Sequence, residues 1–159
     1  MNSGMYGALI VVDDPAKFDP AKEKIILVGG GGPAPPGGDT RGFVNGSDTP
    51  EPLRLDVGST YRLRLINIHP DWRVEFSLGG DTTVAKWRAV AKDGADLPAS
   101  QAKLRSAYLI TGPGETADFD FTPTQPGYMR LQVRTRVAGW NVPVDVFVSE
   151  PKRTAAAMR

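Results

Sequence analysis

Turn-forming residues divide this sequence into short runs of β-type residues and leave no room for a long uninterrupted element. Eighteen glycines and fourteen prolines fall between runs rich in Val, Ile, Leu, Thr, Tyr and Phe, and turn signals recur roughly every ten residues. No stretch carries a convincing helical period, and no internal repeat is present. The pattern predicts an all-β sandwich or barrel.

Alternation of apolar and polar residues predicts half-buried strands. In the clearest case Tyr61, Leu63 and Leu65 share one face of a strand, and Arg62 and Arg64 share the other. Similar alternation predicts strands at residues 74–78, 119–121, 129–133 and 142–148.

Two further strands are predicted near the start of the chain. Residues 6–12 are apolar throughout, which is typical of a strand covered on both faces, and residues 24–28 follow a turn-rich stretch. Residues 29–38 are dominated by glycine and proline, a composition that favours a linker. The dipeptide Asp93-Gly94 predicts a tight turn between strands.

Charge and hydropathy exclude two classes of partner. Nineteen Lys and Arg against eighteen Asp and Glu give a net charge of +1 with the signs interspersed, so we expect no nucleic-acid partner. The longest apolar run, residues 8–12, is far shorter than the ~20 residues that span a bilayer. No export signal opens the chain, and we expect no membrane partner.

Several motifs, in this order and spacing, resemble the multicopper oxidase (laccase-like) family. Residues 4–11, GMYGALIV, look like the strand that closes a copper-binding cupredoxin domain. The rest is similar to a further cupredoxin-like domain through FVNG at 43–46, VG at 57–58, YRLRLIN at 61–67, WRAVAKDGADLP at 87–98, GPGET at 112–116 and PG at 126–127.

The resemblance implies a cupredoxin-like Greek-key β-barrel or sandwich and a division of the chain. Residues 1–28 would correspond to strands at the end of a preceding cupredoxin domain, or residues 6–28 would add strands to the main domain. Residues 29–41 would be a Gly/Pro-rich linker, residues 42–148 the cupredoxin-like domain and residues 149–159 a flexible tail. An exported parent oxidase would place the chain in the periplasm or outside the cell.

In the family, copper is held by His-x-His pairs, a His-Cys-His segment and a methionine. This chain has no cysteine and one histidine, whereas a blue copper site needs a thiolate and two imidazoles. The first His-x-His pair of the family would stand just before Gly4. We therefore expect no copper or other cofactor in this chain, and copper only in the parent family.

Two residues that resemble metal ligands have simpler interpretations. His69 lies in a polar turn between two predicted strands, and we expect it to be a solvated loop residue. Met5 resembles the axial methionine of a blue copper site, but without thiolate and imidazole partners a core or interface role is favoured.

Catalytic and phosphate-binding motifs are not supported. Residues 29–32 are four glycines after a strand, but prolines replace the helix that would bind an anion. Asp118 and Asp120 are expected on a solvated strand face, and Asp93 is expected to form a turn. No serine has a nucleophile-elbow setting.

Aromatic residues offer a second class of function, a ligand platform. Trp87 falls inside the family-like segment and is expected to be structural, whereas Trp140, between Gly139 and Asn141, is the better candidate for exposure. The candidate ligand or interface residues are therefore Trp140, Tyr6 and Met5.

Two functions remain in competition. The first is a copper-free structural domain of a multicopper-oxidase-like protein, not catalytic alone, whose parent activity is copper-dependent oxidation coupled to dioxygen reduction. Its partners would be copper-bearing cupredoxin domains, or a second copy of the chain through the N-terminal strand. The second is a stand-alone β-sandwich that binds a ligand or protein.

Overall fold

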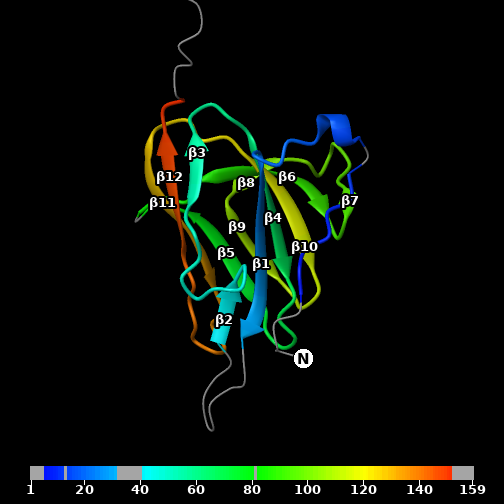
Figure 1. The fold of residues 1–159 in the computed structure, drawn as a ribbon, viewed down its shortest axis with the longest axis vertical. Helices are drawn as coiled ribbons and strands as arrows, with labels where there is room; N and C mark the ends of the chain where they lie inside the picture. Colours follow the sequence, from blue (N-terminus) through cyan, green and yellow to red (C-terminus); the bar gives the residue numbers. More distant parts are fainter. Residues whose placement is uncertain (1–5, 13, 32–40, 81, 152–159) are drawn as a thin grey trace, which may run out of the picture.

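The chain folds into two β-sheets that pack face to face (Figure 1). The computed structural model describes residues 6–12, 14–31, 41–80 and 82–151. Within them lie one turn of 3-10 helix and twelve strands: η1 Pro15–Lys17, β1 Glu23–Gly31, β2 Arg41–Val44, β3 Leu53–Asp56, β4 Tyr61–Asn67, β5 Val74–Gly79, β6 Lys86–Lys92, β7 Ala95–Asp96, β8 Leu104–Ser106, β9 Tyr108–Thr111, β10 Thr116–Phe121, β11 Gly127–Arg134 and β12 Val144–Ser149.

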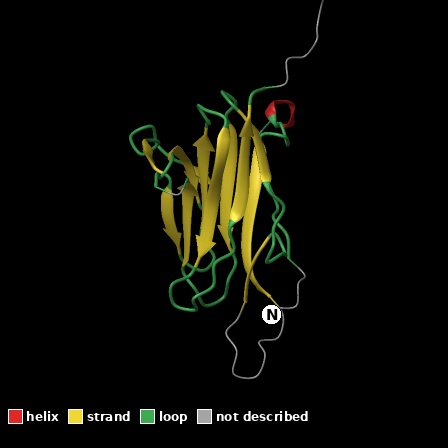
Figure 2. Ribbon diagram, turned by 90° about the vertical axis from the view of Figure 1, so that its left-hand side faces the viewer, coloured by secondary structure: helices red, strands yellow, loops and turns green. Residues whose placement is uncertain are grey.

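The strands form one sheet of seven and one of five. The seven-stranded sheet has the order β2-β1-β4-β10-β6-β7, with β8 also paired to β6, and the five-stranded sheet has the order β3-β12-β11-β5-β9. β1 runs parallel to β4 and β3 runs parallel to β12, whereas the other pairs are antiparallel. Seen from the side, the strands follow the long axis and the loops gather at the two ends (Figure 2). The predicted all-β fold is confirmed.

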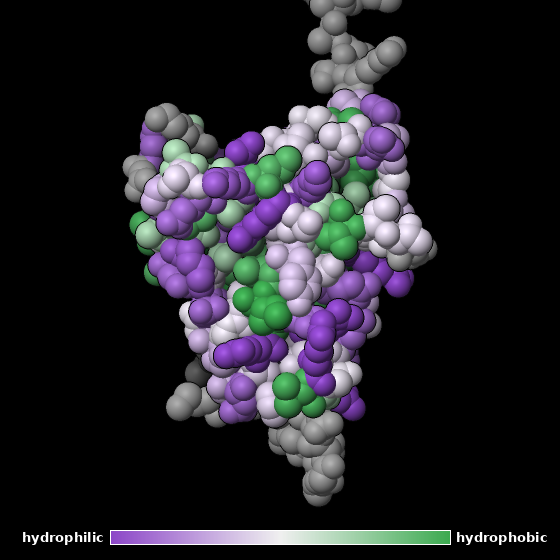
Figure 3. All heavy atoms as spheres, turned by 180° about the vertical axis from the view of Figure 1, so that it is seen from behind, coloured by the Kyte–Doolittle hydropathy of each residue, from purple (hydrophilic) through white to green (hydrophobic). Residues whose placement is uncertain are grey.

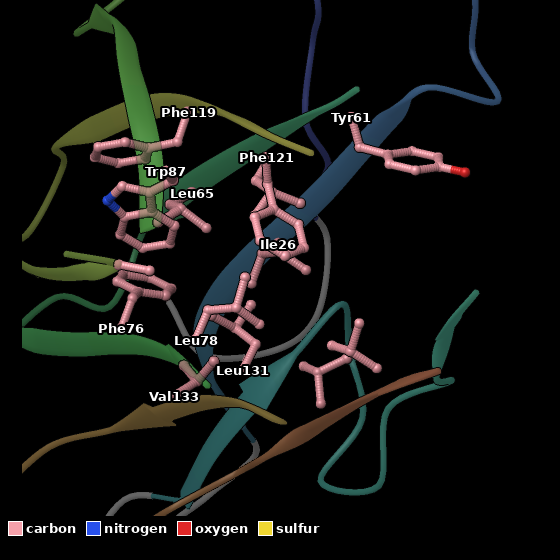
Figure 4. Close-up of a cluster of buried hydrophobic side chains, with 14 of the residues drawn as sticks. Ile26, Tyr61, Leu65, Phe76, Leu78, Trp87, Phe119, Phe121, Leu131 and Val133 are labelled. Carbon is pink, nitrogen blue, oxygen red and sulfur yellow. The ribbon is translucent and has the colours of Figure 1, made fainter. Parts of the chain in front are cut away.

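The core fills the space between the sheets with the apolar side of each alternating strand. β4 buries Tyr61, Leu63 and Leu65, as predicted, and β12 buries Val144, Val146 and Val148. Figure 4 shows side chains from both sheets converging in this cluster. Trp87 is completely buried, which confirms its structural role.

The Asp93-Gly94 turn also forms as predicted. Both residues have positive φ, 49° and 81°, the combination that a tight hairpin turn needs, and they join β6 to β7.

The predicted linker at residues 29–41 is wrong at both of its ends. β1 continues through Gly31, β2 begins at Arg41, and these two residues face each other in the antiparallel pair. Residues 32–40 lie outside the described residues. β1 also pairs with β4 over six positions, so residues 23–31 are part of this sheet. Whether residues 1–28 correspond to the end of a preceding domain stays a prediction.

The predicted strand at residues 6–12 is wrong. These residues carry no strand, and within the described part of the chain no backbone-to-backbone hydrogen bond joins them to another segment. An apolar run alone does not distinguish a paired strand from an extended segment lying on a sheet. At the other end, β12 stops at Ser149, and residues 152–159 of the predicted tail lie outside the described residues.

Candidate functional site

The N-terminal segment, residues 6–12, lies across the outer face of the seven-stranded sheet and leads to η1 (Figure 1). Ile10 and Val12 are half-buried, whereas Leu9 and Val11 are 89% and 82% exposed. The alternation follows from an extended backbone, in which successive side chains point to opposite sides. One side of the segment thus faces the sheet, and the other offers apolar side chains to solvent.

Tyr6 anchors the start of this segment on β1. Its ring lies against Gly29, where an added Cβ would come within 3.0 Å of the Tyr6 hydroxyl oxygen. The Tyr6 side chain is 37% exposed, so the structure places this candidate interface residue partly on the surface. Met5 lies outside the described residues.

A chain of ion pairs lies beneath the segment. The Asp118 carboxylate accepts from Arg62 Nε at 2.9 Å and from Arg64 Nη1 at 2.5 Å, and Arg64 Nε donates to Glu23 at 2.6 Å. Arg62 Nη2 also lies 3.7 Å from Asp96. Adjacent strands β1, β4 and β10 bring these groups together through their registers.

The prediction that Asp118 and Asp120 lie on a solvated face is wrong. Asp118 is buried, since the two arginines cover its carboxylate. Asp120 is half-buried, and this burial raises the pKa of its carboxyl above the usual value, against the opposing effect of the nearby Arg62. The alternation correctly set these aspartates opposite Phe119 and Phe121, but it could not show that this face is covered.

His69 is completely buried, so the prediction of a solvated loop histidine is also wrong. Its backbone N–H donates to Asn67 Oδ1, and its Nδ1 accepts from the backbone N–H groups of Asp71 and Trp72 at 3.2 Å each. Because Nδ1 is an acceptor, the proton of the neutral ring is on Nε2. Burial lowers the pKa of His69 and outweighs the opposing effect of Asp71.

Asn67 is a structural residue that the sequence reasoning missed. It is completely buried, and its side-chain amide donates to the carbonyl oxygens of Trp72 at 3.1 Å and Gly112 at 3.0 Å. It thereby joins the loop after β4 to the loop after β9. A signal was present: Asn67 continues the alternation of Leu63 and Leu65, which places its side chain in the core.

Trp140 is not an exposed platform. It is partly buried against the core, and its indole covers Gly42, where an added Cβ would lie 2.5 Å from the ring. Its Nε1 is buried without a hydrogen-bond partner among the described residues, and its ring centroid lies 6.2 Å from that of His69. The loop between β11 and β12, which contains Gly139 and Trp140, folds back onto β2. A glycine-rich turn pattern in the sequence predicts a hairpin loop but does not show what that loop contacts.

Comparisons with known proteins identify the fold. No protein-family model matches the sequence, and no curated protein matches it significantly. Among solved structures, a multicopper oxidase superposes with a TM-score of 0.65 at 17% identity, covering 80% of this chain and 44% of the other. The blue copper oxidase from Nitrosomonas europaea gives 0.60 at 19% identity, covering 80% and 43%.

A third structure, Fet3p, a multicopper oxidase that functions in iron import, gives a TM-score of 0.63 at 12% identity, covering 92% of this chain and 31% of the other. The chain has the fold of the cupredoxin-like domains of multicopper oxidases. It spans less than half the length of these three proteins.

The residues of this cupredoxin-like domain do not fit a blue copper centre. The sequence offers no thiolate and one imidazole, and the Nδ1 of that imidazole is already hydrogen-bonded to two backbone N–H groups. Among residues 6–12, 14–31, 41–80 and 82–151, no group of three His, Cys, Asp or Glu side chains is placed to hold a metal ion. Those ranges also contain no helix long and apolar enough to cross a membrane.

Proposed function

We propose that this chain is a copper-free structural cupredoxin-like domain of a multicopper-oxidase-like protein and is not catalytic alone. Its role would be to pack against copper-bearing cupredoxin domains and shape them. The parent activity would be copper-dependent oxidation coupled to the reduction of dioxygen.

The proposal rests on the hydrogen bonds and the burial of the His69 ring. A copper ligand presents an imidazole nitrogen to the metal, but the Nδ1 of His69 is held by two backbone N–H groups and its ring has no exposure. The histidine therefore serves the loop after β4. Together with the absence of cysteine, this leaves the fold without the donors that blue copper needs.

The N-terminal segment is the proposed contact with the partner. It is extended and presents Leu9 and Val11 to solvent, and within the described residues its backbone groups pair with no other backbone. Unpaired extended backbone beside exposed apolar side chains favours association with the sheet edge of another domain. That domain would be a copper-bearing cupredoxin domain, or a second copy of this chain.

The competing function, a stand-alone ligand-binding module built on Trp140, has no observation in its favour. The indole of Trp140 covers Gly42 and packs against the core, so its ring is not free to stack on a ligand.

Copper titration tests the copper-free claim. We expect neither stoichiometric binding by calorimetry nor a blue Cu–thiolate absorption band when Cu(II) or Cu(I) is added. A one-to-one isotherm in the wild type that disappears in His69→Asn would overturn the claim. A matched change at Asn67 is unsuitable as a control because Asn67 holds two loops, so Asp71→Asn serves instead.

The contact is tested by light scattering and solubility. Replacing both Leu9 and Val11 with serine should reduce self-association and raise solubility, whereas Val137→Ser, at a residue 72% exposed elsewhere, should change neither. Unchanged mass and solubility in the double variant, and also after deletion of residues 1–12, would contradict a docking role for the segment.

A further inference from the structure

We propose that the space between the N-terminal segment and the outer face of the seven-stranded sheet is a binding site for an organic cation with an apolar body. The site is a cavity of about 870 Å³, within the range of small-molecule pockets. This inference is independent of the proposed structural role, since it concerns a ligand on this domain and not a neighbouring domain.

Part of the cavity lining is apolar. Ile10 and Val12 of the segment, Phe18 after η1 and Ile66 near the end of β4 belong to it. Ile10, Val12 and Phe18 are each only half-buried, so a bound apolar group would remove more of their surface from water. Such burial contributes roughly 25 cal/mol per Å² of apolar surface.

Another part of the lining is acidic. Apart from Asp14, four carboxylates line the cavity against two guanidinium groups, an excess of two negative formal charges in a chain whose net charge is +1: Glu23, Asp93, Asp96 and Asp118 against Arg62 and Arg64. Lys92 stands outside the lining and pairs with Asp93 at 2.9 Å. Even with Lys92 included, one negative charge remains in excess.

The arginines do not convert the cavity into an anion site. Arg62 and Arg64 both donate to Asp118, and Arg64 also donates to Glu23. An anion would have to compete with carboxylates already in contact. Asp96, by contrast, has a side chain 82% exposed and lies 3.7 Å from Arg62, which leaves its carboxylate accessible to a cation at the rim.

A bare metal ion is a poor match for the same place. Among the described residues no three carboxylates converge closely enough to hold one. A cation of low charge density with an apolar substituent fits both kinds of lining residue, because its charge can meet the exposed Asp96 carboxylate while its body covers Ile10, Val12 and Phe18. Protonated amines and quaternary ammonium ions belong to this class.

Three probes of similar size and different charge test the proposal by isothermal titration calorimetry at low ionic strength: benzyltrimethylammonium, benzyl alcohol and benzenesulfonate. We expect saturable one-to-one binding of the cation, with weaker binding of the alcohol and none of the sulfonate. Amide resonances of Gly94 and Gly114, which both line the cavity, should shift as the cation is added.

Two variants that remove the same charge at different places test whether the cation binds at the cavity. Asp96→Asn removes one rim charge and should weaken cation binding about two- to fivefold, the size expected of a partly exposed charge pair. Asp48→Asn removes the same charge from the exposed loop after β2 and should leave the affinity unchanged. Equal circular dichroism spectra and thermal midpoints would show that both variants fold.

Three results would overturn the proposal. They are the absence of saturable cation binding, equal affinity for the cation and the sulfonate, and an equal effect of Asp96→Asn and Asp48→Asn, which would reveal only non-specific charge attraction. None of these results would bear on the copper titration or on the Leu9 and Val11 variants.

Discussion

The indole of Trp87 stacks on the ring of Phe119, with ring centroids 4.2 Å apart and planes inclined by 20°. Trp87 comes from β6 and Phe119 from β10, next to the irregularity in their register between Asp118 and Phe119. The stack lies in the core, on the inner face of the seven-stranded sheet (Figure 4).

Phe119→Ala should lower the free energy of unfolding by about 3 to 5 kcal/mol, because it empties a large buried volume next to Trp87. Urea denaturation followed by tryptophan fluorescence measures the change. Phe147→Ala, at a ring 39% exposed, is the matched control and should cost much less. Equal losses of unfolding free energy in the two variants would contradict the prediction that the buried Phe119 ring stabilises the core more than the exposed Phe147 ring.

Asp118→Asn should destabilise the domain by about 2 to 4 kcal/mol, since it leaves the guanidinium groups of Arg62 and Arg64 without their shared counter-charge in a covered site. Chemical denaturation at neutral pH is the measurement. The same substitution at Asp145 breaks an exposed pair with Arg130 and should cost much less, because water screens exposed charges. A small effect at Asp118 would mean that water reaches the ion pairs in the folded protein.

Acidification should destabilise the domain through His69. The folded state lowers the pKa of His69 below its ordinary 6.5, so the neutral ring stabilises the fold above pH 6.5. This contribution is lost as the pH falls from 6.5 towards the lower pKa of the folded state, because the unfolded chain binds the proton first. NMR titration of the single imidazole should give a pKa below 6.5.

The variant His69→Asn isolates this effect, because its side-chain oxygen can accept the hydrogen bonds made to Nδ1 but cannot be protonated in this range. The stability difference between wild type and variant should narrow as the pH falls below 6.5. Comparing the two proteins at each pH cancels the opposite contribution of Asp120, whose raised pKa adds stability on acidification. A constant difference from pH 7 to pH 5 would refute the prediction.

Gly42→Ala should displace Trp140, because the added Cβ would lie 2.5 Å from the indole. We expect a loss of about 1 to 3 kcal/mol and a red-shifted tryptophan emission. Gly7→Ala is the control, since no atom lies within 4 Å of a Cβ built there. Unchanged emission in Gly42→Ala would show that Trp140 does not rest on β2.

Viewed from behind, apolar residues form separate patches among hydrophilic side chains (Figure 3). Tyr128 and Arg130 on β11 share Asp145 as an acceptor at 2.6 Å and 3.0 Å. These exposed polar contacts break up the apolar surface of the five-stranded sheet.

The sequence by itself determined the class of fold and most of the strands. Alternation at Tyr61, Leu63 and Leu65 set the inner face of β4 because side chains in a strand point to opposite sides with a period of two. The dipeptide Asp93-Gly94 predicted a tight turn because such a turn needs positive φ angles, which few other residues adopt easily. The sequence also lacks the thiolate and the second imidazole of a blue copper centre, because this depends on counting donors and not on their positions.

Only the tertiary structure decided what covers each residue. Alternation put Arg62 and Asp118 on the outer face, but the burial of Asp118 depends on Arg62 and Arg64, which come from a strand distant in sequence. The sequence places His69 in a loop, but this loop folds inward because the Asn67 side chain hydrogen-bonds both to His69 and to the loop after β9. Contacts between segments far apart in the chain have no local signal, and they placed the ion pairs, the buried histidine and the covered tryptophan.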